Sequence, residues 1–230
     1  MKLLCLVPDA NTPGKKDTTG AFHPEAVALA KHLGVAPTSA VRRFPAKAAL
    51  AQRRAVCTRS IEETQDLEVL AFFCHGWRNG LQAGYQLAHV RTLAQLIAGH
   101  MVERAHVVLY ACEAGRDADA DSADDREPGP GGDGGFADEL RDACESLGRH
   151  VTVMGHTTAG HCTQNPYARR FAPGCMGRGG EWFVEPRSAL WGRWVRALRE
   201  PSGTLRLRFW GMTRAEIAEE IRPDGGPLVA

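Results

Sequence analysis

Two apolar runs in this sequence end in side chains that could carry out covalent chemistry. The first run, "VLAFFCHG", ends at His75 and Gly76, and the second, "HVVLYAC", ends at Cys112. A cysteine thiol becomes a good nucleophile when a base such as histidine lies nearby or when its pKa is lowered. The backbone N–H groups of Gly76 and Cys112 could then hold an oxyanion that forms on a carbonyl substrate. These residue types therefore suggest a His75–Cys112 pair that attacks a carbonyl carbon.

The elements that must position this pair are strands of a parallel sheet. Apolar runs predict strands over residues 2–7, 67–73, 106–111 and 150–155. Helical patterns cover residues 23–34, 45–65, 90–104 and 135–148. Strands that alternate with helices indicate an α/β fold with a mainly parallel central sheet and helices on both faces. Sites in such sheets form beyond the carboxyl ends of the strands, so neighbouring strands would bring His75 and Cys112 into one crevice.

The order of these motifs resembles that of the caspase-like cysteine peptidases. In both, a strand ending in His-Gly is followed by a helix and by a strand ending in Ala-Cys, and "YACEAG" is similar to the Glu-Ala-Cys-Glu-Ser-Gly of legumains and the Ser-Ala-Cys-Glu-Thr-Gly of bacterial CHAT domains. The resemblance covers residues 1–160 and implies a three-layer sandwich. It also implies a thiol protease with a His75–Cys112 dyad, an oxyanion hole that includes Gly76 and Cys112, a protein or peptide substrate, and no cofactor.

Two carboxylates near the expected dyad could contact that substrate. Asp9 follows the first strand, where the resemblance puts part of the S1 pocket, and Glu113 follows the nucleophile directly. A carboxylate at the base of the pocket would favour Arg or Lys at P1 through a charge-assisted contact. The alternative is that Asp9 begins an ordinary solvated loop and that Glu113 faces away. Metacaspases have an aspartate two residues before the nucleophile, but this chain has Tyr110 there, so their specificity does not transfer from that position.

The segment "GHTTAGHCTQNP" at 155–166 follows the fourth predicted strand. We interpret it as a substrate-binding loop beside the dyad, with Thr157 and His161 as contact residues. Its ligand types also allow a second hypothesis, a metal-dependent hydrolase centred on His156 and His161. No further cluster of ligands completes a recognisable site, so we expect no metal.

One segment, "RDADADSADDREPGPGGDGG" at 116–135, is acidic and then rich in Gly and Pro. This composition cannot bury an apolar face, and we expect a mobile loop. Its aspartates imitate the start of an EF-hand, but Ser122 replaces the required glycine and Pro128 falls where the bidentate glutamate should be. A solvated acidic linker is the better interpretation. We predict a caspase-like core over 1–165 that contains this loop, and a C-terminal extension over 166–230 that packs on the core.

The composition of the 230 residues limits the partners and the compartment. The 28 Lys and Arg residues nearly balance the 27 Asp and Glu residues, which gives no electrostatic case for a nucleic-acid or membrane partner. The first apolar run is broken by Pro8 and is too short for a signal peptide or a membrane span. Seven cysteines without a C-x-x-C spacing favour reduced thiols in a cytoplasm. One of them, Cys74, should turn to the face opposite His75 and pack in the core.

The sequence therefore predicts a cytoplasmic cysteine endopeptidase that cleaves a protein substrate. The main alternative is a caspase-like interaction module that keeps the fold but has lost the dyad geometry. The presence of His75, Gly76 and Cys112 together favours the enzyme, and the oligomeric state is left open.

Overall fold

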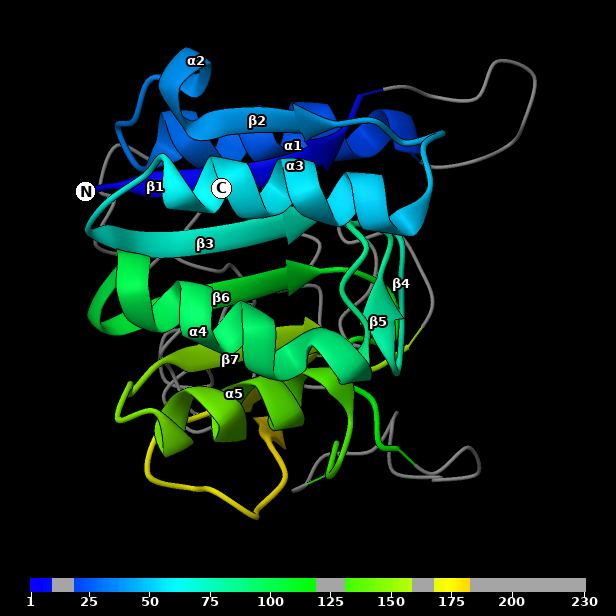
Figure 1. Ribbon diagram of the computed structural model, residues 1–230, viewed down its shortest axis with the longest axis vertical. Helices are drawn as coiled ribbons and strands as arrows, with labels where there is room; N and C mark the ends of the chain where they lie inside the picture. Colours follow the sequence, from blue (N-terminus) through cyan, green and yellow to red (C-terminus); the bar gives the residue numbers. More distant parts are fainter. Residues whose placement is uncertain (10–18, 119–130, 159–167, 183–230) are drawn as a thin grey trace, which may run out of the picture.

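A seven-stranded sheet forms the centre of the molecule (Figure 1). The structure, a computed structural model, describes residues 1–9, 19–118, 131–158 and 168–182. The strands follow one another in space as β2 (Val41–Phe44), β1 (Leu3–Pro8), β3 (Leu67–Phe73), β6 (Met101–Tyr110), β7 (Thr152–His156), β8 (Ala168–Phe171) and β9 (Glu181–Trp182). The first five pair in parallel, whereas β8 and β9 are antiparallel to their neighbours. The predicted α/β fold with a mainly parallel sheet is confirmed.

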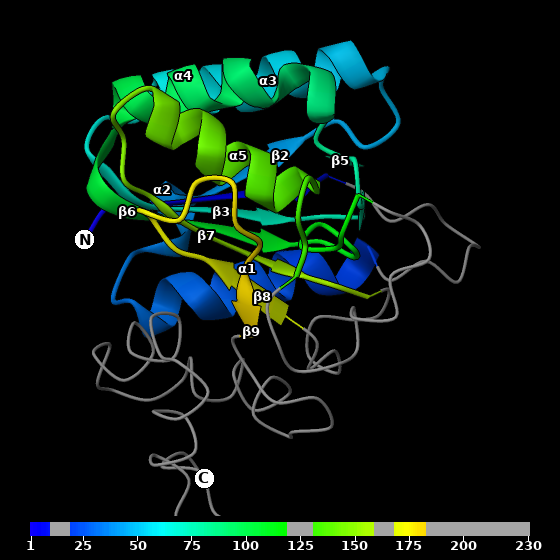
Figure 2. The ribbon, with the colours of Figure 1, turned by 90° about the horizontal axis from the view of Figure 1, so that it is seen from below.

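Helices cover both faces of this sheet (Figure 2). On one face lie α1 (Thr19–His32) and the short α2 (Pro37–Ala40), and on the other lie α3 (Leu50–Glu62), α4 (Val90–His100) and α5 (Phe136–Ser146). Alternate residues of a buried strand point to opposite faces, and the core accordingly divides into two clusters. Phe73 belongs to the cluster under α1, and Phe72 belongs to the cluster under α3, α4 and α5.

The residues that the sequence patterns placed on the buried faces of these helices and strands are buried in the structure. All six residues of β1 are buried, as expected for a strand covered on both faces. The buried residues of α4 recur at helical spacing: Val90, Leu93, Ala94 and Ile97. Helix α5 has two acidic residues in its first turn, Asp138 and Glu139, which its dipole favours, and it ends before Gly148, whose φ of 72° suits a C-terminal cap.

Some elements differ from the sequence prediction. The predicted helix over 45–65 is shorter, since α3 begins at Leu50, and strand β2 precedes it. Two exposed arginines interrupt the apolar pattern of β2, which explains why no strand was expected there. The predicted helix over 90–104 ends at His100, and β6 begins at Met101 with an irregular stretch before its continuous pairing with β3 from His106. A 3₁₀ turn (Leu87–His89) and a small hairpin of β4 (Gly76–Trp77) and β5 (Gly80–Leu81) fill the connection after β3.

The sheet continues past residue 165, where we expected the core to end. Strand β8 pairs with β7, and β9 pairs with β8, while residues 183–230 of the predicted extension lie outside the described residues. Residues 119–130 of the predicted acidic loop also lie outside them. The ends of that loop are joined, because the Ala118 N–H donates to the Asp133 carbonyl at 3.1 Å. Within the described part of the chain, no helix has the length and apolar composition needed to cross a bilayer.

A buried arginine ties α5 to the segment after β8. Arg141 is 1% exposed and forms an ion pair of 2.6 Å with Asp138, which is 3% exposed, and a second pair with Asp142. Its guanidinium also donates to the carbonyl oxygens of Ala172 (3.2 Å) and Arg178 (2.7 Å). The N–H groups of Arg141 therefore hold α5 against the segment after β8.

We expect Arg141→Met to lower the free energy of unfolding by about 3–5 kcal/mol, because it leaves the Asp138 carboxylate buried without its ion-pair partner. The matched control is Arg149→Met, which removes a partly exposed guanidinium 3.6 Å from Glu103 and should leave stability nearly unchanged. Urea unfolding followed by circular dichroism measures both. Equal stabilities of the two variants would contradict the structural role of Arg141.

Candidate active site

The carboxyl ends of β3 and β6 bring His75 and Cys112 to the same edge of the sheet. The two strands are parallel neighbours and Phe73 pairs with Tyr110, so His75 and Cys112 each lie two residues beyond a paired position. The backbone contact continues past the strands. A Cβ atom placed on Gly76 would lie 2.6 Å from the Ala111 Cβ and 2.8 Å from the Cys112 carbonyl oxygen. The His75–Gly76 segment therefore packs directly on the Ala111–Cys112 segment.

Strand alternation orients the side chain of His75 toward α1. Phe73 and Tyr110 belong to the α1-side cluster, and Cys74 and Ala111 belong to the opposite cluster. His75 follows Cys74 and returns to the α1 side, and Cys112 lies in the turn that follows β6. The prediction that Cys74 is a core residue is confirmed. The imidazole of His75 meets the edge of the Phe22 ring from α1, with ring centroids 5.2 Å apart at 84°.

The backbone of His75 is held by Gln82, a residue that the sequence analysis missed. The His75 N–H donates to the Gln82 Oε1 at 3.1 Å, and the Gln82 N–H donates to the His75 carbonyl at 2.8 Å. Arg53 from α3 donates to the Gln82 carbonyl at 3.3 Å. No residue-type motif signals such a clamp, because it depends on the turn geometry of the β4–β5 hairpin.

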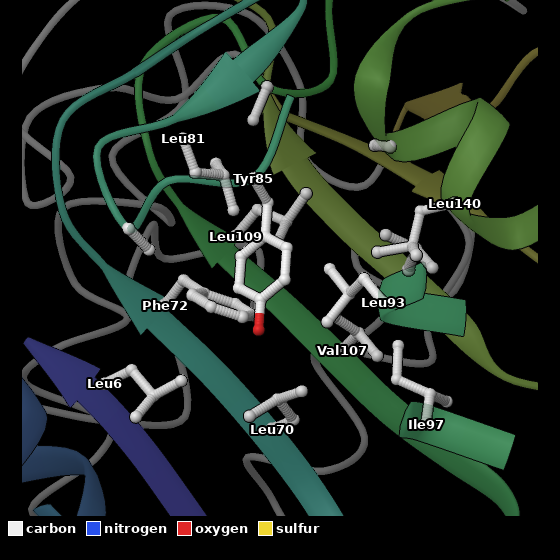
Figure 3. Packing of buried hydrophobic residues seen from close by; sticks show 14 of the residues in the cluster. Leu6, Leu70, Phe72, Leu81, Tyr85, Leu93, Ile97, Val107, Leu109 and Leu140 are labelled. Carbon is white, nitrogen blue, oxygen red and sulfur yellow. The ribbon is translucent and has the colours of Figure 1, made fainter. Parts of the chain in front are cut away.

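The hairpin that carries Gln82 is itself anchored in the core (Figure 3). Leu81 and Tyr85 are fully buried and project toward Phe72 and Leu109 of the sheet. The Tyr85 ring meets the Phe72 ring at 5.9 Å, and its hydroxyl lies 2.9 Å from the Thr58 hydroxyl of α3. Burial raises the pKa of Tyr85 above its usual range, so the phenol stays neutral. The hairpin therefore fixes the backbone of His75 relative to the packed core.

The turn after Cys112 is clamped on the end of β7. The Glu113 N–H donates to the Thr158 carbonyl at 3.3 Å, and the Gly115 N–H donates to the His156 carbonyl at 2.8 Å. Glu113 has a φ of 57°, a left-handed conformation that costs a non-glycine residue about 1–2 kcal/mol. Asp66 and Arg104, away from this site, also have a positive φ, and at Glu113 the hydrogen bonds to the end of β7 hold the conformation.

Exposure separates Cys112 from most of the other described thiols. Cys112 and Cys175 are partly exposed, whereas four thiols are buried: Cys5, Cys57, Cys74 and Cys144. Burial raises the pKa of Cys74 to about 12, against the opposing hydrogen bonds from the Ala83 and Gln82 backbone. Burial also raises the pKa of Cys144 to about 12. These buried thiols stay protonated at neutral pH and are poor nucleophiles.

The predicted substrate-contact residues have diverse environments. Asp9 is exposed at the end of β1, and its Oδ1 accepts a hydrogen bond of 2.9 Å from the Ala46 N–H. The Glu113 Oε1 accepts one of 3.3 Å from Arg116. The Thr157 side chain is fully buried beside the turn that follows Cys112, and His161 lies outside the described residues.

The position two residues before Cys112 carries an aromatic side chain that belongs to the core. Tyr110 is 1% exposed, and its ring stacks on Phe73 with centroids 4.0 Å apart. The ring of His156, which is also buried, lies 6.4 Å from the Tyr110 ring. This side of the site therefore contains one stacked pair of rings, Phe73 and Tyr110, with the His156 ring tilted beside it.

The hypothesis of a metal-dependent hydrolase centred on His156 and His161 finds no support within the described residues. No three His, Cys, Asp or Glu side chains of the described ranges are grouped so that they could hold a metal ion. The two further residues of that hypothesis, His161 and Cys162, lie outside those ranges.

Comparison of the sequence with known proteins gives no match, either to a protein-family model or to a curated protein.

We expect Gly76→Ala to separate the two strand ends, because its Cβ would overlap Ala111 and the Cys112 carbonyl. Overpacking of this kind costs about 1–3 kcal/mol of stability. The control is Gly99→Ala in α4, where a Cβ meets nothing within 4 Å and should stabilise the helix by roughly 0.5–1 kcal/mol. Thermal unfolding tests both. A Gly76→Ala protein as stable as the wild type would show that the contact is loose.

Iodoacetamide should alkylate Cys112 of the native protein faster than the buried Cys5, Cys57, Cys74 and Cys144, since burial makes all four inaccessible and also raises the pKa of the last three. Mass spectrometry of timed samples measures each site, and Cys175 serves as the partly exposed reference thiol. If Cys162 proves the most reactive thiol instead, the assignment of Cys112 as the nucleophile is wrong.

Proposed function

We propose that this protein is a caspase-like cysteine endopeptidase with a catalytic dyad of His75 and Cys112. One observation carries the proposal: Gly76 packs directly on the Ala111–Cys112 backbone at the carboxyl edge of the parallel pair β3 and β6. That edge is the usual location of sites in open α/β sheets. The order of motifs, the helices on both faces and the partial exposure of Cys112 agree with this assignment.

In the proposed mechanism, the Cys112 thiolate attacks the scissile carbonyl carbon of a peptide. The backbone N–H groups of Gly76 and Cys112 stabilise the resulting oxyanion, and the His75 imidazolium donates a proton to the leaving amine. The peptide C–N bond breaks and leaves an acyl group on the Cys112 sulfur. Water, deprotonated by His75, then hydrolyses the thioester and restores the thiol. The strained, clamped turn at Glu113 supports this role, since it fixes the backbone next to the nucleophile.

The P1 preference is a separate proposal, namely cleavage after Arg or Lys. It rests on the Asp9 and Glu113 carboxylates, which lie at this edge of the sheet. The Asp9 Oδ1 already binds the Ala46 N–H and the Glu113 Oε1 already binds Arg116, so each carboxylate would have to recognise a substrate while keeping a structural contact. Asp9→Asn keeps an oxygen acceptor for Ala46 and removes the charge, and it is the variant that tests this preference.

We expect the wild type to cleave members of a peptide library, and both Cys112→Ala and His75→Ala to reduce kcat/KM to background. The double variant should lose little more than either single variant, because the two residues act as a unit. Cys175→Ala, which removes a thiol in the segment after β8, is the matched control and should keep full activity. The library also reports the P1 residue, and a P1 other than Arg or Lys discards the basic preference alone.

The competing interpretation, an interaction module without activity, predicts a different result in the same assay. Neither the wild type nor Cys112→Ala would then cleave any peptide. Activity that survives in Cys112→Ala would contradict the dyad, and loss of activity with a chelator would favour the metal-dependent alternative.

A further inference from the structure

Catalysis by a His–Cys pair requires that the histidine be held as firmly as the cysteine. The cysteine side has its own support, because the turn after Cys112 is bonded to the end of β7 at Thr158 and His156. The Cys74 N–H still donates to the Tyr110 carbonyl at 3.2 Å, but the backbone N–H and carbonyl of His75 bond to a residue outside the seven-stranded sheet. Some other group must therefore define its backbone position.

We propose that Gln82 is the positioning residue of His75, an inference that rests on the proposed dyad. Its side-chain carbonyl accepts the His75 N–H at 3.1 Å, and its own N–H donates to the His75 carbonyl at 2.8 Å. Both backbone polar groups of His75 are thus bonded to a single residue. The two peptide units that flank the His75 Cα are therefore each held by one hydrogen bond to Gln82, which restricts their rotation and sets the direction of the His75 Cα–Cβ bond.

Gln82 is suited to this role because its own position is fixed on two sides. Its carbonyl accepts a hydrogen bond of 3.3 Å from Arg53, whose Nε is held by the Ala48 carbonyl at 2.8 Å. Its neighbours Leu81 and Ala83 are fully buried in the core. The two hydrogen bonds between Gln82 and His75 therefore fix the backbone of His75 relative to α3 and the core.

The chemistry of the clamp requires an acceptor on the side chain of residue 82. An asparagine is one methylene shorter and would not reach the His75 N–H, whereas methionine has a similar length but accepts only weakly. Glutamate keeps the acceptor and adds a negative charge. That charge favours the protonated forms of both the imidazole and the thiol, and it should raise the apparent pKa values of the pair.

The test is the pH dependence of Cys112 alkylation by iodoacetamide in the full-length protein, because this rate reports the dyad without needing a peptide substrate. In Gln82→Met we expect alkylation at neutral pH to fall roughly 10- to 100-fold, since small displacements of a catalytic group have effects of this size. In Gln82→Glu we expect the maximal rate at high pH to be retained while the profile moves to higher pH. The control is Gln65→Met, which removes an amide bonded to His100 near the opposite end of β3 and should keep the wild-type profile.

Comparison of His75→Ala with the Gln82 variants tests the role of Gln82 separately from the proposed His75–Cys112 dyad. If His75→Ala changes the profile but Gln82→Met and Gln82→Glu do not, Gln82 does not position His75 and the dyad stands. If His75→Ala also keeps the wild-type profile, the dyad itself is wrong and the inference is wrong with it. Should Gln82→Met fail to fold, Gln82→Asn, whose shorter side chain does not reach the His75 N–H, decides alone: slower alkylation of Cys112 at neutral pH supports the clamp, and a wild-type profile overturns it. A purely structural role would lower the melting temperature without moving the profile.

Discussion

The parallel pairing of β3 with β6 is the constraint on which the candidate site depends. Its register pairs Phe73 with Tyr110, so the segments that follow β3 and β6 leave the sheet at the same level. Only then can Gly76 lie on the backbone of Ala111 and Cys112, with no room for a Cβ between them. A slip of one residue would turn His75 and Cys112 to opposite faces of the sheet. The packing of the core, which sets this register, therefore determines whether His75 and Cys112 lie close together.

The same alternation separates a buried thiol from a candidate catalytic side chain along one short stretch. Cys74 points into the cluster below α3, α4 and α5, where burial raises its pKa to about 12. His75, the next residue, points to the α1 side and meets the Phe22 ring. Two thiols close to this edge thus differ in exposure, since Cys74 is buried and Cys112 is partly exposed. The opposite directions of Cys74 and His75 follow from the period of two in a strand, which the sequence pattern already shows.

Much of this arrangement could be predicted from the sequence, and the exceptions share a physical cause. Strand β3 has the predicted bounds, because a continuous apolar run is a strong signal for a strand buried on both faces. Strand β2, with two exposed arginines, and the two-residue strands of the hairpin carry no such signal. The strand ends that carry His75 and Cys112 could be identified from their residue types. Gln82 could not, because a side-chain bond to a backbone N–H depends on how the turn closes.

The two members of the candidate dyad are supported by different parts of the chain, and this division explains why the site needs an ordered core on both sides. The end of β7 holds the turn at Glu113, which would otherwise relax from its left-handed conformation. The β4–β5 hairpin, packed through Leu81 and Tyr85, holds the other member through Gln82. The two supports meet where Gly76 packs on Ala111 and where Arg78 of the hairpin donates to the Ala118 carbonyl at 3.3 Å. The spacing of the pair is therefore set by a backbone contact, which is stiffer than any contact between long side chains.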